Sequence, residues 1–189
     1  MNKISIALGA FLSIFLISCE GDPGPVGPPG LDGLDGLDGI QGQVVEVDNV
    51  NFDWFPDMNN FSALINFGDV TDFEVIESDA VLVYRYVDTV DLDDGTTADI
   101  WSQIPQNYFL AEGTLQYVFE HTRVDVEIFI DGNFDLSTLS TEFTDNQSFR
   151  IVFVPSEFAQ AGKMDVSNLG NVMSALGIGE AQVQKIDLP

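Results

Sequence analysis

Hydrophobic and polar residues alternate along much of the chain after residue 44, which is the pattern of half-buried β-strands. The clearest alternation lies in two neighbouring segments, 114–120 and 123–130. Their apolar residues fall on one face of each segment: Leu115, Tyr117, Phe119, Val124, Val126, Ile128 and Ile130. Apolar side chains that face each other across two strands stabilise their pairing. The two segments therefore predict a β-hairpin.

Further strands are predicted from the same pattern at 44–54, 61–67, 80–87, 100–104, 108–110, 149–154 and 183–186. The first of them changes phase along its length, so we expect a β-bulge near Asn49. The segment AVLVYRYV at 80–87 is almost continuously apolar, which is typical of a central strand buried on much of both faces. Proline and asparagine residues predict turns at 55–60 and 105–107.

Two other regions depart from the strand pattern. Residues 88–99 (DTVDLDDGTTAD) predict an acidic hairpin or loop, and 133–147 a polar loop with Leu136 and Leu139 as anchors. Residues 165–176 change to a helical period, with Asp165 or Ser167 as the N-cap and Gly177 at the end. The apolar face of this helix consists of Val166, Leu169, Val172, Met173 and Leu176. Residues 45–189 are thus predicted to be mainly β, an antiparallel β-sandwich with one C-terminal α-helix.

The N-terminal segment 1–18 predicts a signal peptide. A basic residue, Lys3, precedes an apolar stretch that is shorter than the roughly 20 residues of a membrane-spanning helix. Its ending, Leu-Ile-Ser followed by Cys19, resembles the lipobox of bacterial lipoproteins. The resemblance implies that Cys19 carries fatty acyl groups such as palmitate and anchors the protein in a lipid bilayer. The alternative is an ordinary secretory signal with an incidental cysteine.

Residues 19–44 contain a collagen-type Gly-X-Y run. Glycine recurs at every third position from Gly21 to Gly42, as it does where three chains pack around one axis. The run would span roughly 75 Å if extended. Three parallel chains would stack the like charges of Asp32, Asp35 and Asp38, and the run offers no Lys or Arg to offset them. Both a homotrimeric stem and a single-chain spacer stay open, and light scattering distinguishes them.

The chain is strongly acidic. Its 31 Asp and Glu residues against 6 Lys and Arg residues give a formal charge of −25. This charge makes nucleic-acid binding very unfavourable. Two explanations for it stay open: the protein binds divalent cations or cationic partners, or the charge simply keeps it soluble. The single cysteine, Cys19, excludes an intrachain disulfide. The single histidine, His121, lies at the predicted hairpin turn, where a solvent-exposed or turn-capping role is favoured over catalysis.

Two acidic turns are candidate calcium sites, because calcium prefers clustered oxygen ligands on flexible loops. The first contains Asp91, Asp93, Asp94 and Asp99, and the second contains Asp131, Asn133 and Asp135. Neither fits the EF-hand spacing, so ordinary solvated turns are the alternative. Separately, the tripeptide at Asp88, Thr89 and Val90 resembles an O-glycosylation acceptor of exported Bacteroidota proteins, which makes Thr89 a candidate glycosylation site.

Aromatic residues offer one more candidate surface. Trp54, Trp101, Tyr108 and Tyr117 could together form a sugar-binding face, although aromatic residues in strands more often belong to the core. Paired carboxylates could hydrolyse glycosides, but no spacing in this acidic chain singles out a pair. We therefore expect a protein that is not an enzyme and has no cofactor other than a possible calcium ion.

The combination of lipobox, Gly-X-Y run and downstream segments resembles a group of collagen-like-repeat lipoproteins from Bacteroidota. The segments that carry the resemblance are ESDAVLVY, WSQIPQNYF, GTLQYVF and FTDNQSFRIVFVP. It implies an outer-membrane lipoprotein of the cell envelope, either surface-exposed or facing the periplasm, and no catalytic residue is carried over. The expected role is adhesion, protein contact or envelope structure, and the alternative is a glycan- or calcium-binding module.

Overall fold

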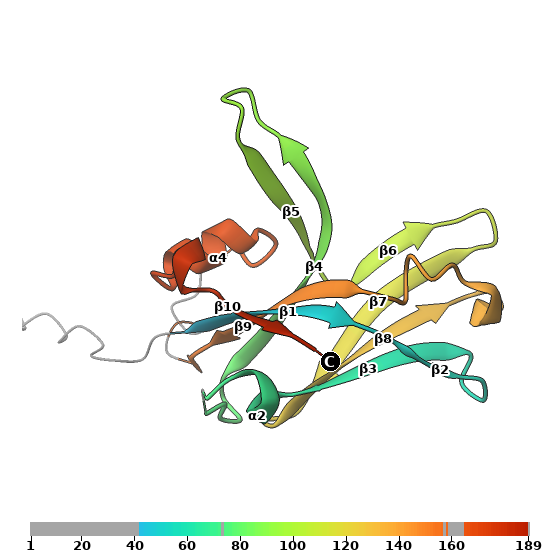
Figure 1. Cartoon of the computed structure of the whole chain (residues 1–189). Coiled ribbons are helices and arrows are strands. Elements are labelled where there is room, and N and C mark those ends of the chain that lie inside the picture. The colour runs from blue at the N-terminus through green and yellow to red at the C-terminus, as the bar shows by residue number, and fades with distance from the viewer. Residues whose placement is uncertain (1–41, 73, 157, 159–164, 189) are drawn as a thin grey trace, which may run out of the picture. The chain divides into compact units, whose positions relative to one another are not determined.

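The chain after residue 41 folds into two five-stranded β-sheets that pack together (Figure 1). The computed structural model describes residues 42–72, 74–156, 158 and 165–188. The predicted signal peptide, Cys19 and most of the Gly-X-Y run lie outside the described residues. The fold is mainly β, as the alternating pattern predicts.

Each sheet combines segments from distant parts of the chain. The first sheet contains, in spatial order, β10 (Gln184–Asp187), β1 (Gln43–Val50), β9 (Gln147–Val154), β4 (Ala80–Asp91) and β5 (Thr97–Gln103). The second sheet contains β2 (Asp53–Phe55), β3 (Asn60–Asn66), β8 (Asp125–Gly132), β7 (Thr114–His121) and β6 (Gln106–Phe109). Short helices join or cover them: α2 (Phe67–Val70), η2 (Leu136–Thr138), α4 (Leu169–Ala175) and η3 (Glu180–Gln182).

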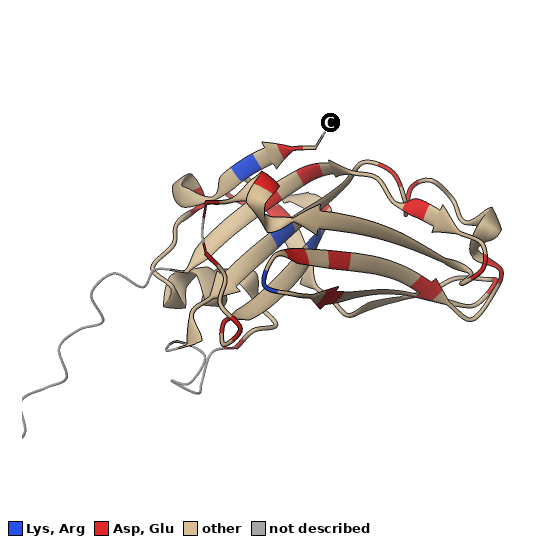
Figure 2. Cartoon of the chain, turned by 90° about the horizontal axis from the view of Figure 1, so that it is seen from below, with Lys and Arg blue, Asp and Glu red and all other residues tan. Residues whose placement is uncertain are grey.

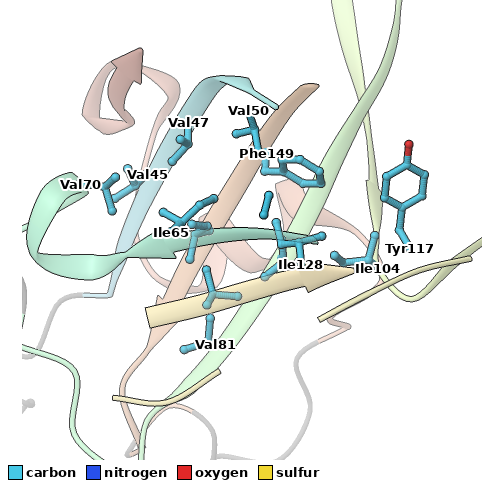
Figure 3. Close-up of a cluster of buried hydrophobic side chains, with 14 of the residues drawn as sticks. Val45, Val47, Val50, Ile65, Val70, Val81, Ile104, Tyr117, Ile128 and Phe149 are labelled. Carbon is cyan, nitrogen blue, oxygen red and sulfur yellow. The ribbon is translucent and has the colours of Figure 1, made fainter. Parts of the chain in front are cut away.

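The main hydrophobic core lies between the two sheets (Figure 3). Side chains from both sheets point into it, among them Val45, Val47, Val50, Ile65, Val81, Tyr117, Ile128 and Phe149. The predicted hairpin at 114–130 is confirmed as β7 paired with β8, and its Leu115, Tyr117, Val126, Ile128 and Ile130 are all fully buried. Val124 instead precedes β8 and is exposed.

A second, smaller core covers the opposite face of the first sheet. It joins strand residues to α4 and consists of Val44, Tyr84, Val152, Val154, Leu169, Val172, Met173 and Leu176. β1, β4 and β9 are covered on both faces, which agrees with the apolar runs at 80–84 in β4 and 151–154 in β9. The prediction of a central buried strand at 80–87 is confirmed by β4, which lies between β9 and β5.

The predicted bulge near Asn49 is confirmed. The register between β1 and β9 shifts between Val47 and Val50, and Asn49 has a positive φ of 58°. The bulge returns Val50 to the core side, and the chain then crosses to the second sheet as β2. The single strand predicted at 44–54 is therefore two strands in different sheets.

The C-terminal helix is shorter than predicted. It begins after Asn168, whose side chain accepts a hydrogen bond from Asn171 N, and not at Asp165 or Ser167. Asp165 instead accepts hydrogen bonds from the backbone and hydroxyl of Ser167, which form a separate turn. The predicted end is confirmed, because Gly177 has a φ of 69°. The one-turn helix α2 was not predicted.

Tyr84 connects the first sheet to the segment ahead of α4. Its hydroxyl donates a hydrogen bond of 2.5 Å to Val166 O. Burial, together with the nearby Asp165, raises the pKa of Tyr84 to about 12. The phenol is therefore neutral at physiological pH and available as a donor.

Strand direction corrects the expected antiparallel sandwich. β10 pairs with β1 in parallel, with Val45 opposite Gln184 and Asp48 opposite Asp187, while the other pairs in both sheets are antiparallel. β9 ends beside Gln43 and β10 begins beside Val45, so the chain returns to the sheet at the same end, and β10 runs opposite to β9 and parallel to β1. Hydrophobic periodicity is the same in either direction, so it does not predict this pairing.

Of the two forms predicted for residues 88–99, a hairpin or a loop, the hairpin is confirmed. β4 continues to Asp91 and β5 starts at Thr97, with a short turn between them. The predicted turn at 105–107 is shorter, since Gln106 already belongs to β6. Leu136 is fully buried and Leu139 packs against the core, which confirms both loop anchors. Within the described residues, no helix has the length and apolar character to cross a membrane.

Gly42, the last glycine of the Gly-X-Y run, is buried where the chain enters the first sheet. A Cβ at this position would lie 2.7 Å from Phe153 O and 2.9 Å from Leu176 Cδ1. The close approach of these atoms requires glycine here. Since β1 starts at Gln43, the folded domain includes the last residues assigned to the stalk at 19–44.

We predict that Gly42→Ala lowers the free energy of unfolding by about 1–3 kcal/mol, because the added methyl overpacks this contact. Urea denaturation followed by circular dichroism measures the change. Gly68→Ala is the matched control, since a Cβ at Gly68 meets no atom within 4 Å. If both variants kept wild-type stability, the close packing at Gly42 would be disproved.

Candidate functional site

The first acidic turn uses its carboxylates within the β4–β5 hairpin. Asp94 accepts hydrogen bonds from the hydroxyl and the backbone N–H of Thr96, and these bonds lower the pKa of Asp94. Asp99 accepts a hydrogen bond from Thr89 Oγ1 at 2.7 Å. In the part of the chain that the structure describes, no three His, Cys, Asp or Glu side chains converge as metal ligands. Asp91, Asp93, Asp94 and Asp99 are therefore not gathered into a calcium site.

The second acidic turn has a similar structural role. Asn133 Oδ1 accepts a hydrogen bond from Thr114 N at 2.8 Å. Asp135 is the N-cap of η2, and the hydrogen bonds from Ser137 lower its pKa. Asp131 belongs to strand β8. These contacts are typical of Asx turns and caps, which stabilise loops without a metal ion.

Thr89 and His121 both lie at exposed positions. Thr89 Oγ1 contacts Tyr86 Oη at 2.7 Å as well as Asp99, so its hydroxyl is exposed but already hydrogen-bonded. Glycosylation of Thr89 stays a prediction. His121 ends β7, and its Nδ1 lies 3.2 Å from the carbonyl oxygen of Thr122.

The four aromatic residues do not form a common sugar-binding face. Trp54, Tyr108 and Tyr117 belong to the main core, where Tyr117 is fully buried. Trp101 belongs to the second cluster beside α4. One face of its ring is covered by the Arg150 guanidinium, 4.3 Å from the ring centroid, and Tyr86 packs against it edge-on. The first sheet separates Trp101 from the other three, so they share no common face, and the favoured alternative that these aromatic residues belong to the core is confirmed.

Arg150 is the centre of a buried ionic network. Its guanidinium is 3% exposed and donates to Glu46 Oε2 at 2.8 Å and to both carboxylate oxygens of Glu180. Lys185 Nζ pairs with the other Glu46 oxygen. Burial lowers the pKa of Arg150, but the hydrogen bonds that Arg150 donates to Glu180 and Glu46 outweigh it, and the pKa is raised. The network joins β9, β1, η3 and β10.

A surface hollow of about 320 Å³ lies beside this network, and Asp99, Trp101, Arg150, Asn168 and Glu180 are among its lining residues. The nitrogen atoms of Arg150 already donate to carboxylates of the chain itself. The hollow is therefore poorly suited to bind an anion, in spite of its arginine.

Arg85 is a second buried arginine, and it is held by neutral groups. Its Nε and Nη2 donate to Gln147 Oε1, and its Nη1 donates to Tyr108 Oη at 2.6 Å. The guanidinium also lies 4.6 Å from the centroid of the Tyr117 ring. No carboxylate pairs with Arg85 among the described residues. Since Arg85 belongs to β4 and both tyrosines belong to the second sheet, these contacts connect the two sheets.

These contacts leave an acidic surface (Figure 2). Of the basic residues that the structure describes, Arg85 and Arg150 are buried and Lys185 is paired with Glu46, while Arg123 lies exposed at the β7–β8 turn. In the sequence, the signal for this buried pair is an arginine within each of the apolar runs AVLVYRYV and FRIVFV. No sequence pattern indicates the partners of either arginine.

The strongest candidate for a binding site is the loop end, which we define as the turn at 56–59, the end of β6 with the following turn at 109–113, and the loop at 133–146. Side-chain amides hold these segments together. Asn59 Nδ2 donates to Phe134 O at 2.8 Å, and Asn59 Oδ1 accepts from Leu136 N at 3.0 Å. The segments therefore form one continuous surface.

The loop end exposes large apolar side chains. Phe109 is 84% exposed and Met58 is 63% exposed, and each lies at the edge of a turn. Beside the turn at 110–113 is a recess of about 230 Å³. Its lining includes the apolar residues Leu110, Phe134, Leu139 and Phe143 and the carboxylates Glu112 and Glu142. Exposed apolar groups around an amphipathic recess are typical of an interaction site.

The loop end lies opposite the point where the chain enters the domain. Strand β1 runs from Gln43, which pairs with Phe153, to Val50, which pairs with Gln147. The loop at 133–146 directly precedes Gln147, and its Asn146 N donates to Asn51 Oδ1 at 2.9 Å.

Comparison of the chain with protein-family models, with curated proteins and with solved structures gave no match.

We predict that Arg150→Met lowers the free energy of unfolding by about 3–5 kcal/mol, because it leaves the Glu46 carboxylate buried with Lys185 alone. Urea denaturation at neutral pH measures the loss. Arg123→Met is the matched control, since Arg123 is exposed and should change stability by less than about 0.5 kcal/mol. Equal stability of the two variants would contradict the structural role of Arg150.

Proposed function

We propose that this chain is a lipoprotein of the bacterial outer membrane that displays a non-enzymatic interaction domain. The lipobox at Cys19 and the Gly-X-Y run support the anchor and the spacer. The two packed sheets supply a rigid domain. Its acidic surface favours contact with proteins or glycans over contact with nucleic acid.

The observation that carries the proposal is the exposure of Phe109 and Met58 on the loop end. Large exposed apolar side chains lose contact with water when a partner covers them, which favours association. The chain enters the domain at the opposite end, so an anchor ahead of Gly42 leaves the loop end accessible to a partner. This arrangement suits adhesion or contact with another envelope protein.

We predict that a photo-crosslinking amino acid placed at Phe109 of the anchored protein yields a discrete adduct with a partner on intact cells. The same crosslinker at Leu64 is the control, because Leu64 is 55% exposed but lies on β3, away from the turns of the loop end. Gel electrophoresis and mass spectrometry detect the adduct. No adduct at position 109, or equal adducts at both positions, would rule out the loop end as the contact surface.

The recess beside Phe134 and Phe143 favours a second candidate, a glycan-binding module. Aromatic rings can pack on sugar faces, and the Glu112 and Glu142 carboxylates can accept hydrogen bonds from sugar hydroxyls. A glycan that binds here should raise the melting temperature of the protein by mass action, and Glu142→Gln should reduce that shift. Thermal unfolding with a glycan panel measures both effects. A panel without any shift argues against this candidate.

A further inference from the structure

The β4–β5 hairpin extends beyond the first sheet, and we define the part at 87–100 as the arm (Figure 1). Strand β9 pairs with β4 only between Ala80 and Arg85. Strands β4 and β5 stay paired with each other as far as Asp91 and Thr97. The arm is therefore a two-stranded ribbon, and such a ribbon is only marginally stable without a further layer or strand.

One face of the arm is polar and internally bonded. Thr89 lies opposite Asp99, and their side chains form a hydrogen bond of 2.7 Å. The Tyr86 hydroxyl joins this pair, and the Tyr86 ring packs against Trp101 at the base of the arm. Side chains alternate between faces along a strand, so Asp91 and Thr97 share this face with them.

The other face of the arm is mainly apolar and is uncovered. Val90 lies opposite Ala98, and the bulge places Val87 next to Asp88, which lies opposite Ile100 and is the one charged residue of this face. Val87, Val90 and Ile100 are 40%, 38% and 41% exposed. Nearer the sheet, Val81 and Val83 of the same strand are buried in the main core. The arm thus continues an inward-facing apolar surface past the point where the second sheet covers it.

The edge of the arm is also open. β5 is the last strand of the first sheet, so among the described residues it has a strand neighbour only on its β4 side. Backbone N–H and C=O groups on an unpaired edge can hydrogen-bond to an added strand. An apolar face beside an open edge is the arrangement that strand addition uses.

Charge identifies the kind of partner. The arm contains no Lys, Arg or His and carries the aspartates Asp88, Asp91, Asp93, Asp94 and Asp99. A second copy of the same arm would bring like charges together, which opposes self-association through this edge. Lysine or arginine residues on an added strand would instead lie close to Asp91 and Asp99.

We propose that the arm docks an extended basic segment of a partner protein, which adds to the edge of β5 as a further strand. The segment alternates apolar with Lys or Arg residues. Its apolar side chains extend the patch of Val87, Val90 and Ile100, and its cationic side chains lie on the face of Asp91 and Asp99. This surface is separate from the loop end, and the proposal does not depend on the lipid anchor.

The test measures the binding of fluorescent peptides to the full-length protein in detergent by anisotropy. The probe is a short peptide of alternating valine and lysine. One control peptide replaces valine by glycine at the same charge, and another carries backbone N-methyl groups that block strand pairing. We expect the valine–lysine peptide to bind at least about tenfold more tightly than either control.

Variants of the protein locate the binding surface. We expect Ile100→Asp to weaken binding of the valine–lysine peptide by about tenfold or more, because it places a charge in the apolar patch. Leu64→Asp is the matched control, since Leu64 is exposed on β3, and it should bind as the wild type does. Asp91→Asn with Asp99→Asn should also weaken binding and reduce its dependence on salt.

The outcomes separate strand addition from simple attraction of opposite charges. Equal binding of all three peptides would overturn the proposal and leave only non-specific attraction to an acidic protein. Absence of binding, or equal loss in the Ile100→Asp and Leu64→Asp variants, would overturn it as well. Circular dichroism confirms that each variant is folded. If Ile100→Asp does not fold, the Asp91→Asn and Asp99→Asn double variant still tests the proposal.

Discussion

The contact between Arg150 and Glu46 is the centre of a network that holds the C-terminal part of the chain, from α4 to β10, on the first sheet. Both groups are buried in adjacent strands of the first sheet, where an unpaired charge would be very unfavourable. Glu180 and Lys185 complete the network from the segment that follows α4. The network thereby places the short strand β10 along β1 and keeps α4 over the second core. A buried ion pair adds little net stability, but it makes the arrangement of these segments specific.

The position of the basic residues has a consequence for the surface. The chain has 31 acidic residues and only 6 basic residues, and the fold places two of the basic residues, Arg85 and Arg150, inside. Arg85 connects the two sheets through Gln147 and Tyr108, so both arginines serve the structure. The surface that remains is acidic, which excludes polyanions and favours basic partners. Exposed apolar groups on the loop end and on the arm give such partners two places to dock.

Sequence periodicity predicted those features that depend on which face of a strand is buried. The β7–β8 hairpin, the bulge at Asn49 and the glycine end of α4 follow from local pattern. The parallel direction of β10 and the convergence of Glu46 with Arg150 depend on contacts between distant segments, which periodicity does not encode. For residues 88–99 the sequence did not distinguish a hairpin from a loop. Both faces of a two-stranded ribbon are open to solvent, so its strands have no row of buried apolar residues. The type of an aromatic residue favours the core but does not reveal which side of a sheet it occupies, so the placement of Trp101 in the second core was not predictable.

We conclude that two of the three arginines, Arg85 and Arg150, lie inside this domain as structural groups and that its surface is acidic. Modification of the folded protein with phenylglyoxal, followed by peptide mass spectrometry, tests this claim directly. The account predicts rapid modification of Arg123 and protection of Arg85 and Arg150 until the protein is unfolded. Modification of Arg85 or Arg150 at the rate of Arg123 in the native protein would contradict it.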